Sequence, residues 1–96
     1  MKLFWTELAL SDLAALHEHI SAADNAVAAD QMLNRIIVLA ETQLPRMPDS
    51  GRLGRVPNTR ELVVTGSPYF LPYRIAGEAI HILRVIHGAR RWPEKE

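Results

Sequence analysis

The segment PRMPDSGRLGRVPN, residues 45–58, divides the chain into two parts with different hydrophobic periods. It holds three prolines and two glycines, a composition that favours a loop. Apolar residues before it recur at helical spacing, and those after it alternate as in strands. We therefore expect a helical first part, a β-sheet second part and a long connection that, like many long loops, has a functional role.

The first part predicts one short strand and two helices. KLFW (2–5) is short and apolar, and Thr6 is a residue type that caps a helix. One apolar helix face follows, and Asp24 or Asn25 can cap the next helix, which Pro45 ends. The two predicted apolar faces consist of Ala9, Leu13, Leu16 and Ile20, and of Ala29, Leu33, Ile36, Ile37, Ala40 and Leu44.

The second part predicts three strands, TRELVV (59–64), YFLPYRI (69–75) and AIHILRVIH (79–87), joined as antiparallel hairpins. Pro72 cannot donate to a ladder, so the middle strand needs a bulge or an unpaired position there. Simple alternation places one side of the last strand on a common face: Ile80, Ile82, Arg84 and Ile86.

The fold class is therefore α+β. We expect a single domain over 1–96, in which an N-terminal strand and a helical hairpin pack on a small curled antiparallel sheet in the order β-α-α-β-β-β. No apolar run is long enough to span a bilayer and no signal peptide opens the chain, so a cytoplasmic protein without membrane contact is expected.

Charge is unevenly distributed although the 96 residues carry no net charge. Residues 1–50 hold three basic and seven acidic side chains, a net −4, whereas residues 51–96 hold eight basic and four acidic, a net +4. The second part is thus where an acidic or anionic partner would bind, unless the two parts attract each other within the fold.

Catalytic and metal-binding patterns are weak. The chain has no cysteine, and His17 and His19 point to different sides of a helix. His81 and His87 would lie about 20 Å apart along an extended strand. No metal site, cofactor or serine nucleophile is expected.

Arginines form the pattern that remains. Arg74 and Arg84 on adjacent predicted strands, with Arg60 and the Arg90/Arg91 pair, could line a positive groove interleaved with aromatic residues, as phosphate or nucleic-acid contact requires. Alternatively, Arg60, Arg74 and Arg84 form structural ion pairs with Glu61, Glu78 and helix carboxylates. Spacing alone favours the ion pairs.

The whole pattern resembles the RelE/ParE superfamily of bacterial toxins. The similarity rests on FWTELALSDLAALHEHI, DSGRLGR, NTRELVV, PYFLPYRI and ILRVIHGARRWP, which cover nearly the full chain. It implies a type II toxin neutralised by a cognate antitoxin, in a toxin–antitoxin hetero-oligomer. The ParE-like branch, whose loop and C-terminal patterns this chain shares, inhibits DNA gyrase by direct binding.

The RelE-like branch implies a different activity, metal-independent cleavage of mRNA in the ribosome. That branch has an arginine where this chain has Phe70, and a C-terminal tyrosine that is missing here; Arg90 matches its other arginine, and His87 could act as a base. A third possibility is a member that binds antitoxin without toxicity. We expect no catalytic residue in the ParE-like case, and target binding by Arg60, Arg74, Arg84, His87, Arg90, Arg91 and Trp92.

Overall fold

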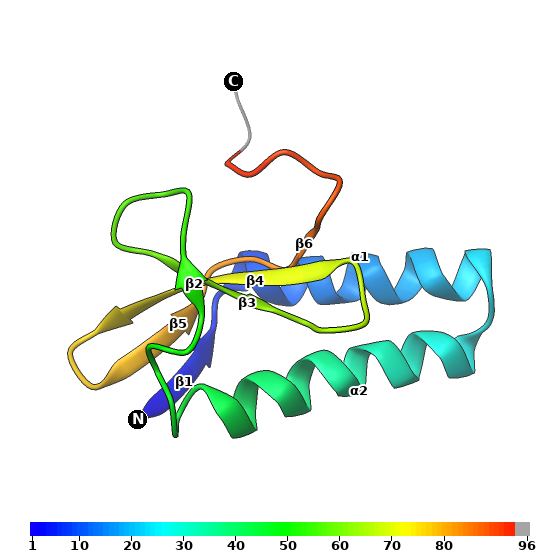
Figure 1. Cartoon of the computed structure of the whole chain (residues 1–96). Coiled ribbons are helices and arrows are strands. Elements are labelled where there is room, and N and C mark those ends of the chain that lie inside the picture. Colours follow the sequence, from blue (N-terminus) through cyan, green and yellow to red (C-terminus); the bar gives the residue numbers. More distant parts are fainter. Residues whose placement is uncertain (94–96) are drawn as a thin grey trace.

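A computed structural model describes residues 1–93 of the chain. Two antiparallel helices cover one face of a sheet, and the turn that joins them lies far from the strands (Figure 1). The α+β class and the β-α-α-β-β-β order are confirmed. The elements are β1 (Lys2–Trp5), α1 (Glu7–Ala23), α2 (Ala26–Gln43), β2 (Arg52–Leu53), β3 (Arg60–Val63), β4 (Tyr69–Ala76), β5 (Ala79–Ile82) and β6 (Ile86–His87).

Both helices begin at the caps that the sequence predicts. The Thr6 hydroxyl accepts a hydrogen bond from the backbone N–H of Ala9 at 3.1 Å, and the Asn25 side chain accepts from Ala28 at 2.8 Å. Each cap satisfies a donor that the first helical turn leaves unpaired. Within the described part of the chain, no helix combines the length and apolarity needed to cross a membrane.

The sheet is mixed, in the order β1-β5-β4-β3-β2. β1 pairs with β5 in parallel, with Leu3 opposite Ile80. A parallel pair needs a long crossover connection, and here that connection includes the helical hairpin. The expected antiparallel sheet therefore carries one parallel strand, β1, at its edge. The β3–β4 and β4–β5 pairs are antiparallel, as expected. The prediction that residues 45–58 form only a loop is wrong at Arg52–Leu53, because these two residues form β2 and pair antiparallel with Glu61 and Arg60 of β3.

A bulge interrupts the sheet beside Pro72. Tyr73 of β4 lies opposite Ile82, and Phe70 lies opposite Ile86. Two residues of β4 between these pairs thus face the three residues 83–85, which is one residue too many for a regular ladder. The interruption predicted at Pro72 is present, although the extra residue belongs to the opposite strand. The prediction of one continuous strand over 79–87 is wrong, because the bulge divides it into β5 and β6.

The extra residue changes which side chains face the helices. Val85 joins the core between helices and sheet, together with Ile82. Ile86 instead pairs with Phe70 on the opposite face of the sheet, where both are buried. The predicted common face is therefore wrong for Ile86, while Arg84 lies in the bulge and its guanidinium binds Asp12 of α1.

Tyr73 anchors the long connection to the sheet. Its hydroxyl donates to the Pro48 carbonyl at 2.7 Å and accepts from the Gly51 N–H at 2.9 Å. A Cβ at Gly51 would lie 2.6 Å from the Tyr73 ring, so only glycine permits this approach. Burial raises the pKa of the Tyr73 hydroxyl, while the bond from Gly51 opposes that rise. The phenol is therefore a neutral donor at physiological pH.

We predict that Tyr73→Phe lowers the free energy of unfolding by about 1–3 kcal/mol, because it leaves two backbone groups without their partner. Urea unfolding followed by circular dichroism measures the change. Tyr69→Phe is the matched control, since no hydrogen bond is recorded for its hydroxyl among residues 1–93 and the expected change is below about 0.5 kcal/mol. Equal effects of the two substitutions would contradict this role of Tyr73.

Candidate functional site

A buried carboxylate organises the face of the sheet that the helices leave uncovered. Glu61 on β3 is 1% exposed. One of its oxygens accepts from Arg52 Nε at 2.9 Å, and the other accepts from the backbone N–H of Arg55 at 3.1 Å. A buried carboxylate is tolerated only when such donors surround it. Glu61 thereby fixes the start of the loop between β2 and β3.

The same two arginines cover Phe70. The guanidinium carbon of Arg52 lies 5.4 Å from the centre of the Phe70 ring, and that of Arg55 lies 5.0 Å from it. Phe70 is 3% exposed as a result. The arginines of GRLGR therefore combine an ion pair with packing on an aromatic ring.

The structure does not bring the predicted arginine groove together. In the β3–β4 ladder Arg60 lies opposite Tyr73, so it is on the helix side of the sheet. Its guanidinium donates to the carbonyls of Asp49 at 3.1 Å and Gly51 at 2.8 Å. Arg74, the next residue after Tyr73, is exposed on the other face. Residues on opposite faces cannot line one groove.

Arg84 is a structural residue of the bulge. It donates from Nε to one Asp12 oxygen at 2.7 Å and from Nη2 to the other at 3.0 Å. The backbone N–H of Val85 donates to the same carboxylate at 2.9 Å. This ion pair with a helix carboxylate is the alternative that spacing favoured. The partly buried Trp92 ring lies 6.0 Å from the Arg84 guanidinium carbon, so the tail packs against this ion pair.

The other predicted C-terminal residues lie at the end of β6 and just beyond it. His87 is exposed, its ring meets Tyr69 edge-on at 5.5 Å, and its Nδ1 accepts from the Ala89 N–H at 3.1 Å. Arg90 and Arg91 have exposed side chains. His87 and Arg90, the two residues of the nuclease alternative, line one hollow of about 310 Å³ with Tyr69 and residues of α1. Among residues 1–93, no group of three potential ligand side chains is placed to hold a metal ion.

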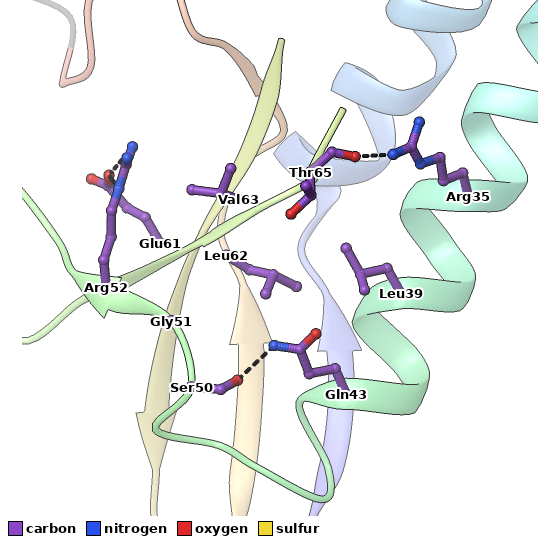
Figure 2. A pocket seen from close by; sticks show the side chains of 10 residues that line it. All are labelled: Arg35, Leu39, Gln43, Ser50, Gly51, Arg52, Glu61, Leu62, Val63 and Thr65. Carbon is purple, nitrogen blue, oxygen red and sulfur yellow. Dashed lines mark hydrogen bonds and ion pairs between the residues drawn. The ribbon is translucent and has the colours of Figure 1, made fainter. Parts of the chain in front are cut away.

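A second hollow of about 400 Å³ separates α2 from the outer edge of β3 (Figure 2). Leu39 of α2 and Leu62 of β3 face each other across it. Two polar contacts bridge its ends, from Arg35 to the Thr65 carbonyl and from Gln43 to the Ser50 hydroxyl. β2 pairs only with Arg60 and Glu61 of β3, so the rest of that edge is open. We call this hollow the α2–β3 groove.

Sequence reasoning missed the groove and the Glu61 cluster. Glu61 carried one usable signal, a charged residue alternating with apolar ones in a strand. The groove carried none, because Arg35 and Leu39 read as ordinary surface and flank positions of an amphipathic helix.

Comparison with known proteins agrees with this architecture. Residues 3–92 match the family described as the ParE toxin of the type II toxin–antitoxin system parDE. The chain is 39% identical to the Sinorhizobium fredii protein Y4kP over 90 residues, which cover 94% of this chain and 91% of that one. It is 38% identical to toxin RelE2 of Caulobacter vibrioides over 86 residues, 90% and 93% of the two chains.

A solved structure from the chromosomal ParDE system of P. aeruginosa superposes with a TM-score of 0.83 at 29% identity, covering 91% of this chain and 95% of that one. The fold is thus that of a RelE/ParE superfamily toxin. Within that superfamily, the chain belongs to the ParE toxin family of type II toxin–antitoxin systems.

Proposed function

We propose that this toxin inhibits DNA gyrase by binding it in the cytoplasm, so that cleaved DNA accumulates, and that a cognate antitoxin neutralises it. The observation that carries the proposal is the environment of Phe70. RelE-like nucleases have an arginine at this position, where it can hold the scissile phosphate. Here a phenylalanine is 3% exposed beneath Arg52 and Arg55, and those arginines are engaged by Glu61. A protein inhibitor needs no such catalytic group.

The C-terminal segment is the best candidate for target contact. The side chains of His87, Arg90 and Arg91 are exposed at the end of the sheet, whereas Arg84 is largely buried in its ion pair with Asp12. Exposed arginines grouped beside an aromatic residue are typical of residues that dominate binding energy at protein interfaces. Trp92 contributes by holding the tail against Arg84.

We predict that the purified full chain blocks supercoiling of relaxed plasmid by gyrase and makes cleaved plasmid accumulate. Arg90→Ala combined with Arg91→Ala should weaken this inhibition by about tenfold or more, because two interface arginines are removed. Arg46→Ala, at an exposed position after α2, is the matched control and should inhibit normally. Agarose gel electrophoresis of the plasmid gives both readouts.

The parallel experiment uses mRNA bound in the ribosome. The RelE-like alternative has its own support, since His87 and Arg90 line a single hollow and the chain is 38% identical to a protein named toxin RelE2. Cut mRNA together with normal supercoiling would overturn the gyrase proposal and make His87 and Arg90 catalytic candidates. If neither target responds, the third possibility, a non-toxic member that binds antitoxin, is favoured over both.

For the antitoxin, we propose docking along the α2–β3 groove. Solved relatives include the RelBE2 toxin–antitoxin complex of Mycobacterium tuberculosis, with a TM-score of 0.67 at 26% identity over 93% of this chain and 92% of that one. The open edge of β3 can accept an extended segment as an added strand. Leu39 and Leu62 offer an apolar floor, and Arg35 offers a cation, so the segment should combine an apolar side chain with an acidic one.

We predict that Arg35→Glu weakens antitoxin binding by about tenfold or more, because the substitution puts a like charge opposite the acidic segment. The affinity can be measured by isothermal titration with the antitoxin. Arg46→Glu carries the same charge change outside the groove and should bind normally. Unchanged affinity of Arg35→Glu, with thermal stability intact, would place the antitoxin elsewhere and leave the gyrase proposal untouched.

A further inference from the structure

Three adjacent strands place an aromatic pair and a cation in one row on the helix-free face of the sheet. In the register, Phe4 of β1 lies opposite His81 of β5, and His81 lies opposite Arg74 of β4. Directly opposite residues share a face. Pro72, two residues before Arg74 and on the same face, lies opposite Glu61. The Glu61 cluster therefore covers one end of this face, and Phe4 lies at the other end.

The Phe4 and His81 rings are stacked. Their centroids lie 5.5 Å apart with 21° between the planes. Phe4 nevertheless remains 47% exposed. Since His81 covers one face of the Phe4 ring, the open face is the one turned away from His81. A third planar ring could continue the stack there.

Cations lie on two sides of the stacked rings, and most of the side chains in the neighbouring row are small. Lys2, two residues before Phe4 and on the same face, lies about 7 Å away along the strand; Arg74, two strands away, lies about 10 Å away. The row next to the stack consists of Lys2, Ala79 and Ala76, of which two are alanines. An open hollow of about 760 Å³ lies here, lined by Met1, Lys2, Phe4, Glu78 and Ala79. Among the described residues that line it, Glu78 is the acidic one, and Lys2 and Arg74 are the nearby cations.

We propose that this surface binds a segment of single-stranded nucleic acid, with a base stacked on Phe4 and phosphates near Lys2 and Arg74. Exposed rings on a sheet that are flanked by cations suit unpaired bases, because every base has a flat face and every nucleotide a negative charge. A peptide partner would need apolar side-chain pockets, which the alanine row does not offer. The inference goes beyond the proposed function, since it requires neither gyrase nor antitoxin.

The test measures fluorescence anisotropy of a labelled oligothymidine or oligouridine of about 12 nucleotides titrated with the purified full chain. We expect saturable binding that is weaker for a duplex of the same length, because paired bases cannot stack on Phe4. Phe4→Leu should raise the Kd by about 5- to 100-fold, and Phe4→Tyr, which keeps a ring, should not. Thermal unfolding of each variant checks that the sheet edge is intact.

Salt dependence separates this site from general attraction to positive charge. Arg74→Gln should reduce the slope of log K against log salt by about 0.7, the value for one phosphate contact on a single strand. Arg46→Gln removes an exposed arginine that does not line this hollow and should leave the slope unchanged. Equal effects of the two variants, equal affinity for duplex, or no saturable binding would overturn the proposal.

Discussion

The carboxylate of Asp12 stabilises the bulge at which the regular strand pairing of the sheet is interrupted. Pro72 has no N–H to donate, and the strand opposite it forms a bulge over residues 83–85. A bulge leaves backbone donors without ladder partners. Asp12, projecting from α1, accepts from the backbone of Val85 and from two guanidinium nitrogens of Arg84. One helix residue therefore stabilises the bulge and ties the sheet to α1.

The bulge also determines where the C-terminal segment lies. Because it adds one residue, Val85 faces the helices and Ile86 faces the opposite side. His87 then ends β6 at an exposed position, and the chain continues past the sheet to Arg90 and Arg91. A regular strand would have put Arg84 on the apolar face of Ile80 and Ile82. The same interruption thus separates the partly buried Arg84 from the exposed Arg90 and Arg91.

The two faces of the sheet have different functions in this account. The helix side contains the core and, at its open β3 edge, the α2–β3 groove that we assign to the antitoxin. The other face is covered at one end by the Glu61 cluster and open at the other around Phe4. Partners on separate surfaces can be tested by separate substitutions.

Much of the fold could be predicted because its signals are local. The caps Thr6 and Asn25, the two helical periods and the change of period after residue 58 each depend on neighbouring residues. The parallel pairing of β1 with β5 and the full extent of the bulge depend on which strands meet, which no local pattern encodes. Pro72 gave the position of the interruption without showing which strand would take the extra residue.

The candidate site was less predictable for the same reason. Arginines at similar spacing proved to have different environments: Arg84 has a carboxylate partner on α1, and Arg60 binds loop carbonyls. Arg74 lies exposed on the opposite face. Their types indicated a basic surface, but only tertiary contacts show which of them remain exposed. The resemblance to a toxin superfamily came from the order of many weak motifs over the whole chain, and the family match supports it.

The central claim, that Asp12 and Arg84 together hold the bulge, is tested most directly by a double-mutant cycle. Asp12→Ala, Arg84→Ala and the double variant would be compared by urea unfolding. We predict a loss of about 3 kcal/mol or more for each single variant and a coupling energy of about 1.5–3 kcal/mol between them, because each substitution removes two charge-assisted hydrogen bonds from a largely buried ion pair. Additive, near-neutral effects would contradict the account and return Arg84 to the residues available for target binding.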